Sequence, residues 1–414
     1  MKKYFYLLAL ALSQIAFAQY ADPNYAIPAT GYGSDGSHTV AVETFANVNF
    51  AGHTINIYHP GDISTPVPTI FYSHAYGGND PENIIGMLEF VAKKGYAIVY
   101  VPYQTLATTT IQQRYDNLKA GFRKAAQDYP NIISTDKVGF MGHSFGGGAS
   151  FAIAQELFTN DGWGTNGRFI YALAQWYSYF ADNSLLDNYP DNTKVLIEVF
   201  ADDSTNDHRM AIDVFNHLNV SAAEKDYVLV SSSTVNGYNY EATHSLPNTA
   251  TAFDALDYYA YYRFIDALAD YAFNGNTAGK DVALGHGSTA QVTMPGEMTP
   301  LQSFSNPYPL HLQSYYEFPC NNADDNPRID YCTTTAGIEE ISNNVVSIYP
   351  NPATEVINIT TTLATLSINI YSTMGQQVNH YELNQNAATI NMQALPKGMY
   401  LVEVNGIAHK VIRN

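Results

Sequence analysis

The order of apolar and polar positions divides residues 40–273 into strands that alternate with helices. Two strictly alternating runs, 40–48 and 53–58, predict an antiparallel hairpin at the start of a sheet. Short apolar runs that predict buried strands follow at 69–73, 96–101, 138–141, 169–174, 195–200 and 227–232. Runs with helical spacing lie between or after them, at 82–94, 111–125, 149–157, 208–218 and 252–273. Strands that alternate with helices of this length predict an α/β domain with a mainly parallel sheet and right-handed crossovers.

The last 70 residues have a different pattern. A short polar stretch, 333–344, contains few large apolar residues and reads as a linker. Beyond it, alternating runs at 356–360, 366–371, 388–392, 400–404 and 409–412 are separated by turn residues. Residues 345–414 are therefore expected to form a small antiparallel β-sandwich, and they contain no candidate catalytic cluster.

The N-terminus and the overall charge indicate an exported protein. Residues 1–18 have a charged start (Lys2 and Lys3), an apolar centre (7–12) and a small-x-small end (16–18), as in a secretory signal peptide. That run is too short to span a bilayer, and no later run is long enough. A formal charge of −19 and a pI near 4.8 argue against nucleic acid and anionic membranes as partners.

Cys320 and Cys332 are the two cysteines of the chain, and both fall in the exported part. An even pair in an oxidising compartment predicts a disulfide, here one that closes a short polar loop. The Asn/Asp cluster of that loop, 321–326, could bind calcium through its oxygens, but a solvated turn is favoured because the spacing of a calcium loop is missing. No metal site is predicted. The cysteines end an extension, about 274–332, of the α/β domain (19–332).

A strand–turn–helix junction at 138–157 carries the candidate chemistry. Gly142-x-Ser144-x-Gly146 follows an apolar strand and precedes a helical run, which is the context in which this motif presents a nucleophilic serine. The glycines let strand and helix approach without Cβ clashes, and the N–H of Phe145 points to where an oxyanion would develop.

Partners of this serine are expected beyond the carboxyl ends of the strands. Three aspartates follow the strand at 195–200: Asp203 is chosen as the triad acid, Asp202 is second, and Asp207 is read as the N-cap of the next helix. His244, in the loop after the last strand, is the expected base. His143 is expected to pack beneath the turn, and His74 to brace a neighbouring loop.

The chain order Ser144, Asp203, His244, together with the elbow and the alternating strands, resembles the α/β-hydrolase fold over about residues 40–273. Within it, Tyr76, Trp176 and the pair His244-Ser245 resemble the cutinase-like and dienelactone-hydrolase-like branch, which includes bacterial polyester-degrading esterases. The resemblance implies that the N–H groups of Tyr76 and Phe145 form an oxyanion hole and that Trp176 is an aromatic wall for the substrate. Ala75 departs from the glycine usual in that branch.

The C-terminal module resembles the sorting domain of type IX secretion. The resemblance rests on the Tyr-Pro-Asn-Pro opening at 349–352, the turn at 371–375, the hairpin at 395–400 and the closing 409–412. It implies the secretion machinery as a partner, export through the periplasm and outer membrane, and then release or surface attachment. A carbohydrate-binding sandwich is the alternative for this module.

The sequence as a whole therefore predicts a secreted serine hydrolase that cleaves carboxylic esters through an acyl-enzyme and needs no cofactor. Polyesters are among the candidate substrates. A serine peptidase or amidase is the enzymatic alternative, and a surface binding protein that keeps the hydrolase scaffold is the non-catalytic one.

Overall fold

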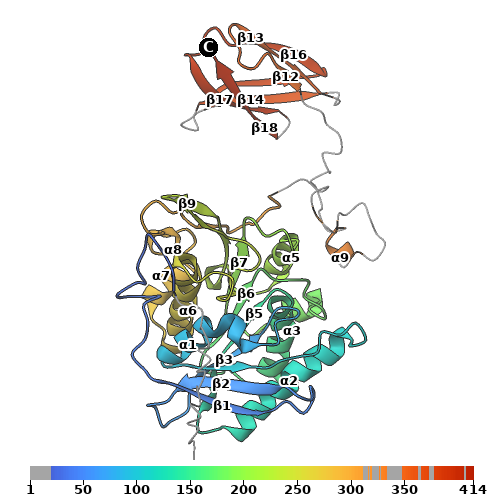
Figure 1. The fold of residues 1–414 in the computed structure, drawn as a ribbon. Helices are drawn as coiled ribbons and strands as arrows, with labels where there is room; N and C mark the ends of the chain where they lie inside the picture. The colour runs from blue at the N-terminus through green and yellow to red at the C-terminus, as the bar shows by residue number, and fades with distance from the viewer. Residues whose placement is uncertain are drawn as a thin grey trace, which may run out of the picture. The chain divides into compact units, whose positions relative to one another are not determined.

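A computed structural model describes residues 20–310, 316, 318, 326, 328–332, 347–361, 365–372, 377–404 and 407–414. The chain divides between Ile329 and Asp330 into two compact units (Figure 1). The predicted signal peptide, 1–18, and the predicted linker, 333–344, lie outside the described residues.

Among the described residues of the first unit, nine strands form one sheet in the order β1-β2-β4-β3-β5-β6-β7-β8-β11. Neighbouring strands from β4 to β8 run parallel, whereas β1, β2 and β11 pair antiparallel. The predicted α/β class and mainly parallel sheet are confirmed, including the hairpin at the start. The strands are β1 (Val40–Ala46), β2 (Thr54–Pro60), β3 (Val67–Ser73), β4 (Ala97–Tyr100), β5 (Ile133–His143), β6 (Arg168–Leu173), β7 (Thr193–Phe200), β8 (Lys225–Val230) and β11 (Gln302–Ser303).

Helices cover both faces of this sheet (Figure 1). One apolar core joins the sheet to α1 (Ile85–Lys93) and α6 (Arg263–Asn274). The other joins it to α2 (Ile111–Asp128), α3 (Phe145–Asn160) and α5 (Arg209–His217). Because both faces are covered, the central strands are buried along almost their whole length, and this explains their near-continuous apolar sequences.

The long helix expected from residue 252 begins later. A π-helical segment, Asp257–Tyr262, leads into α6. The carboxylate of Asp254 accepts the N–H of Leu256 at 2.9 Å, and the carboxylate of Asp257 accepts the N–H of Asp254 at 2.9 Å. These reciprocal side-chain bonds cap the helix at this point, a signal that apolar periodicity does not carry.

The described part of the extension lies along the β8 edge of the sheet. It contains α7 (Thr277–Ala283), α8 (Thr289–Val292) and β11, which pairs with β8. Asp226 of β8 anchors it, because its buried carboxylate accepts the Ser303 hydroxyl at 2.7 Å, the Gln291 amide at 2.8 Å and the His286 N–H at 2.9 Å. Cys332 ends α9 (Ile329–Cys332), but Cys320 lies outside the described residues, so the disulfide and the reading of 321–325 stay predictions.

The second unit is all β, as predicted. Its described strands form two sheets, β12-β13-β16 and β15-β14-β17-β18, around one small apolar core. The sequence did not predict β15, whose side chains are half-buried or exposed at an edge and therefore lack a clear alternation. The strands are β12 (Ser347–Tyr349), β13 (Val356–Thr360), β14 (Leu366–Ser372), β15 (Gln377–Leu383), β16 (Ala387–Asn391), β17 (Gly398–Val404) and β18 (Ile407–Arg413).

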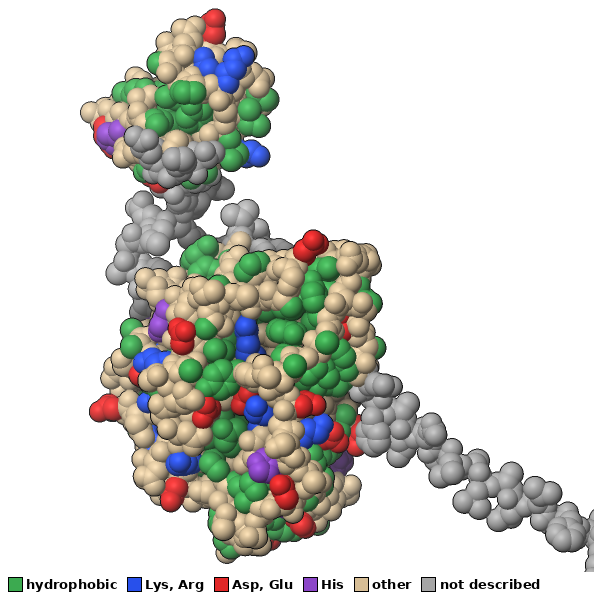
Figure 2. All heavy atoms as spheres, turned by 90° about the vertical axis from the view of Figure 1, so that its left-hand side faces the viewer, with side chains coloured by type: hydrophobic (Ala, Val, Ile, Leu, Met, Phe, Trp, Pro, Cys, Tyr) green, Lys and Arg blue, Asp and Glu red, His purple; other side chains and the backbone are tan. Residues whose placement is uncertain are grey.

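The surface of the first unit is mostly polar and uncharged. Figure 2 shows one of its faces, on which acidic and basic side chains lie scattered among uncharged groups. This distribution follows from a composition in which only 14% of residues are charged. It leaves no broad basic surface on this face for a polyanion.

Glu198 is an ionisable side chain buried inside the sheet. Glu198 of β7 is 0% exposed, accepts a hydrogen bond from the Tyr171 hydroxyl through Oε2, and has no partner for Oε1 among the described residues. Burial raises the pKa of Glu198 from its usual 4.5 to about 8, more than the Tyr171 hydrogen bond and the charge of Arg263 lower it. The side chain is therefore neutral in the folded protein at pH 7.

This burial predicts a pH-dependent stability. In the unfolded chain Glu198 ionises near pH 4.5, whereas in the folded chain it ionises near pH 8. Its contribution to the free energy of unfolding is therefore fully present below pH 4.5 and is lost as the pH rises to 8, by about 1.4 kcal/mol per pH unit at most. Glu198→Gln should raise the melting temperature at pH 8 and leave it unchanged at pH 4.5. Thermal unfolding at both values, with the exposed Glu297→Gln as control, tests this; a gain at pH 4.5 as large as at pH 8 would contradict it.

Candidate active site

Ser144 lies on a strained turn between β5 and α3. Its φ of 56° and ψ of −120° are unfavourable for a residue with a Cβ atom. Three backbone hydrogen bonds hold the turn: the Ser144 N–H donates to the carbonyl of Leu173 at 2.9 Å, and the Ser144 carbonyl accepts from Gly148 at 3.1 Å and Trp176 at 2.8 Å. The end of β6 thus fixes the elbow from one side.

The glycines of the motif make the turn sterically possible. A Cβ on Gly146 would lie 1.9 Å from the Ser73 carbonyl oxygen at the end of β3, and a Cβ on Gly142 would lie 2.3 Å from the Gly146 oxygen. Both contacts are far shorter than any real Cβ tolerates. Helix α3 can therefore begin directly against the sheet only with glycine at these two positions.

The structure brings Ser144, His244 and Asp203 into one hydrogen-bonded row. His244 follows β10 (Tyr238–Tyr240), and its Nε2 lies 2.9 Å from Ser144 Oγ. Its Nδ1 lies 2.8 Å from Asp203 Oδ2. Because a carboxylate only accepts, Nδ1 carries a proton toward Asp203, and Nε2 is left to accept from the serine hydroxyl.

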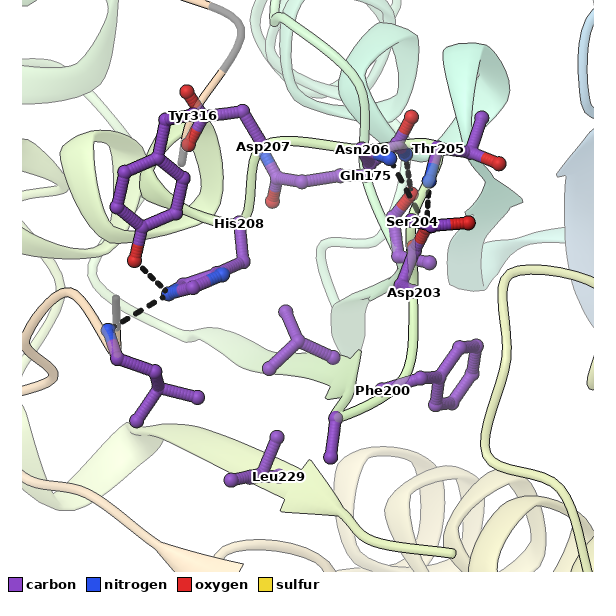
Figure 3. Close-up of a pocket in the computed structure, with 14 residues that line it drawn as sticks. Gln175, Phe200, Asp203, Ser204, Thr205, Asn206, Asp207, His208, Leu229 and Tyr316 are labelled. Atoms are coloured by element: carbon purple, nitrogen blue, oxygen red, sulfur yellow. Dashed lines mark hydrogen bonds between the residues drawn. The ribbon is translucent and has the colours of Figure 1, made fainter. Parts of the chain in front are cut away.

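Of the three aspartates after β7, only Asp203 reaches His244. Its other oxygen, Oδ1, accepts the N–H groups of Thr205 at 2.8 Å and Asn206 at 3.0 Å, as Figure 3 shows. Asp202 is exposed, and no described residue hydrogen-bonds to its carboxylate.

Asp207 instead forms a buried ion pair with Arg209. The Arg209 guanidinium lies 2.6 Å from Oδ2 of Asp207. The N-cap of α5 is His208, so the prediction that Asp207 caps this helix is wrong by one residue. The Asp207 carboxylate nevertheless accepts the Arg209 N–H at 3.1 Å, so it bonds the first turn of α5 from one position before the N-cap residue.

His74 braces the loop after β3. Its Nε2 accepts the N–H of Tyr103 at 3.2 Å, its Nδ1 donates to the Ala75 carbonyl at 2.6 Å, and its ring stacks on Tyr103 at 4.0 Å. Burial lowers the pKa of His74 to about 3, so the ring is neutral and can accept and donate at the same time. The neighbouring N–H of Tyr76, like that of Phe145, has no acceptor among the described residues.

His143 also stays neutral. It is 7% exposed, and its ring lies 4.7 Å from that of His244. Burial, with the neighbouring His244 as a second cause, lowers the pKa of His143 to about 3. Its Nε2 has no hydrogen-bond partner among the described residues. His143 therefore packs beside His244 without competing for the carboxylate of Asp203.

Trp176 contacts the elbow through its backbone. Its N–H holds the Ser144 carbonyl, and its half-buried ring lies 5.8 Å from that of Phe318 of the extension. The ring lines neither of the two cavities beside the row of three side chains. Its predicted role as an aromatic wall stays a prediction.

Sequence reasoning missed Arg114. This residue begins the second turn of α2, and its guanidinium lies 5.1 Å from the ring of Tyr76 and 5.7 Å from that of Phe145. It also donates to the carbonyls of Gln104 at 3.0 Å and Leu106 at 3.1 Å. Arg114 thus ties the loop after β4 to both residues of the expected oxyanion hole. Only the folded path of that loop reveals this.

Two cavities flank the row. One of about 280 Å³ lies between the loop after β3 and the His244 loop, and His74, Tyr76, His143 and His244 are part of its wall. The other, of about 220 Å³, lies behind Asp203, where Figure 3 shows His208 hydrogen-bonded to the Tyr316 hydroxyl. Asp203, whose side chain is 7% exposed, therefore borders the cavity beside the extension, and His244, 19% exposed, borders the cavity beside the loop after β3.

The glycine contacts generate the first prediction of this site. Gly146→Ala should lower the free energy of unfolding by more than about 4 kcal/mol, because its Cβ would overlap the Ser73 carbonyl. Gly52→Ala is the control: Gly52 also has a positive φ, but its Cβ would meet no atom within 4 Å, so the cost is about 1 kcal/mol. Urea unfolding of both variants measures the difference, and equal losses would contradict the steric argument.

The second prediction concerns the two buried histidines, His74 and His143. Their imidazole NMR signals, assigned by their loss in His74→Gln and His143→Gln, should not shift between about pH 5 and 8, because burial keeps both rings neutral throughout that range. The exposed His286 serves as an internal reference for a solvent-accessible ring. A titration of either buried ring near neutral pH would refute the assignment.

No group of three or more His, Cys, Asp or Glu side chains among the described residues could hold a metal ion. The same part of the chain contains no helix with the length and apolar character needed to cross a membrane.

A search of curated proteins found no match to the chain. Residues 347–414 match the family model of the secretion system C-terminal sorting domain, which confirms the type IX resemblance of the second unit. The protein is therefore exported, through the type IX machinery that reads this domain, and is either secreted or attached to the cell surface.

Proposed function

We propose that the protein is a secreted serine hydrolase of the α/β-hydrolase fold that cleaves carboxylic esters. The observation that carries the proposal is the continuous row from Ser144 Oγ through His244 to Asp203, with separations of 2.9 and 2.8 Å, built on a serine at positive φ. A row of this geometry is the arrangement that activates a serine for attack on a carbonyl carbon.

Ser144, His244 and Asp203 have separate roles in the proposed acyl transfer. Ser144 Oγ attacks the ester carbonyl while His244 Nε2 takes its proton, and Asp203 stabilises the imidazolium through Nδ1–H. The N–H groups of Tyr76 and Phe145 are free to receive the oxyanion, and one such donor is worth about 3 kcal/mol of transition-state stabilisation. His244 then gives its proton to the leaving alcohol. Water attacks the acyl-enzyme by the same path in reverse, so the residues named are sufficient for hydrolysis.

The fold assignment rests on chain order and on placement. The nucleophile lies between β5 and α3, the acid follows β7, and the base follows the last parallel strand, in the order Ser, Asp, His. Both expected oxyanion donors occupy the positions that this fold uses, directly after the nucleophile and in the loop after β3. An ester is favoured over an amide because the branch that the sequence resembles is rich in esterases.

Activity against p-nitrophenyl esters tests the proposal. Ser144→Ala should abolish turnover, and Asp203→Asn should reduce kcat by about 10⁴-fold because the carboxamide no longer fixes the tautomer of His244. Asp202→Asn is the matched control and should leave kcat unchanged, since the exposed Asp202 carboxylate does not reach His244. Turnover of an anilide but of no ester would assign a peptidase or amidase. Absence of both, in a protein that melts cooperatively, would favour a binding protein on this scaffold.

A further inference from the structure

The cavity of about 280 Å³ beside His244 is placed to receive the leaving group, an inference that rests on the proposed function. In acyl transfer the proton on His244 Nε2 passes to the oxygen of the departing alcohol, so that oxygen must come within hydrogen-bond reach of the imidazole. His244 and Ser245 line the cavity on one side, and the loop from His74 to Asp80 lines it on the other. The alcohol therefore departs along this cavity.

The wall of the cavity carries hydrogen-bonding groups that the fold leaves unused. The carboxamide of Asn83 makes no hydrogen bond to any described residue, although it lies in the wall and is only half exposed. Asn248 uses its Oδ1 to accept the Ala250 N–H at 3.0 Å, which leaves its amide hydrogens free among the described residues. The Ser245 hydroxyl has one contact, at 3.4 Å, to that of Thr243. Donors and acceptors thus converge from two loops on one small space.

A further polar atom of the same wall is buried. His143 is 7% exposed, and its Nε2 has no hydrogen-bond partner among the described residues. A buried imidazole nitrogen without a partner costs free energy unless a solvent or ligand group completes it. Ile84 and the rings of Tyr72 and Tyr100 supply apolar wall between these groups. A mainly apolar wall with a few polar groups suits a molecule with hydroxyl groups on a carbon frame.

The charge and the volume of the cavity limit the class of alcohol that it can bind. Among the described residues of the wall, Asp80 is the one with an ionisable acid, and no lysine or arginine faces it. An anionic alcohol would therefore be repelled. The volume is at the lower end of pockets that bind small molecules, so one ring or a short chain is enough to fill it.

We propose that the cavity beside His244 binds the alcohol part of the substrate, and that this alcohol is small, uncharged and rich in hydroxyl groups, such as a single sugar or a sugar alcohol. Asn83 and Asn248 are the residues that select it. In the reaction the bond between the acyl carbon and the sugar oxygen breaks, the bond from the acyl carbon to Ser144 Oγ forms, and the serine proton leaves on the sugar hydroxyl by way of His244.

Two esters with the same acyl group test the proposal. Methyl glucoside monoacetate and cyclohexyl acetate both present a six-membered ring, but only the first carries hydroxyl groups. We expect kcat/KM for the sugar ester to exceed that for cyclohexyl acetate by about 25-fold, from two hydrogen bonds of about fivefold each. Asn83→Ala should lower kcat/KM for the sugar ester about fivefold and leave that for cyclohexyl acetate unchanged. Asn131→Ala, an exposed asparagine in the loop before β5, is the control.

The outcomes separate this proposal from the one on which it rests. If no ester is turned over, or if Ser144→Ala keeps the activity, the hydrolase assignment fails. If turnover depends on Ser144 but the two esters react equally and Asn83→Ala changes neither, the hydroxyl-rich alcohol is wrong while the hydrolase stands. Acetylcholine as the best of three acetate esters would assign the cavity to a cationic alcohol through Asp80 and would likewise overturn the proposal. Inhibition by free methyl glucoside, weakened in Asn83→Ala, is expected as the independent binding readout.

Discussion

The close approach of α3 to the ends of β3 and β5 is the constraint on which the first unit depends. At Gly146 the helix backbone lies so near the Ser73 carbonyl that no side chain fits between them. This contact places the first N–H groups of α3 at the end of β3, where the next loop begins. It also forces Ser144 into a positive φ, because the chain must reverse within one residue. The strain is local, and the sheet and helix that meet there are both buried.

The ends of neighbouring strands then hold everything that surrounds Ser144. The carbonyl of Leu173, at the end of β6, accepts the Ser144 N–H, and the N–H of Trp176, just after β6, donates to the Ser144 carbonyl. Ala174 has a positive φ of 39°, and its carbonyl accepts the side-chain amide of Asn206, which belongs to the same loop as Asp203. The loop that carries Asp203 is therefore tied to the strand that also supports Ser144. This shared support explains how His244, 100 residues after Ser144, can lie within hydrogen-bond distance of both Ser144 and Asp203.

Most of this arrangement could be predicted from the sequence because its signals are local. Buried parallel strands have near-continuous apolar runs, and the two glycines around Ser144 predict the tight turn between strand and helix. The choice of Asp203 over Asp202 rested on the resemblance, because the acid of the resembled family usually lies at that place relative to the following helix. By contrast, β15 is a polar edge strand, and Arg114 acts through a loop brought to it by the fold. The helical stretch before α6 begins where the Asp254 carboxylate accepts the Leu256 N–H and the Asp257 carboxylate accepts the Asp254 N–H. None of these has a periodic signature. The paths of loops and extensions are set by contacts between residues far apart in the chain.

The three histidines around Ser144 show how the fold assigns different roles to one residue type. His74 is buried, and both its ring nitrogens hydrogen-bond to backbone groups, so it holds the loop after β3 in place. His143 is buried with one nitrogen unpartnered, and desolvation holds it neutral. His244 alone among the three is partly open to solvent and has a carboxylate on Nδ1. The carboxylate fixes the orientation of the ring, and partial solvent access leaves its Nε2 side reachable. Burial and partner choice, more than position in the sequence, therefore single out His244 as the group that can exchange a proton with Ser144.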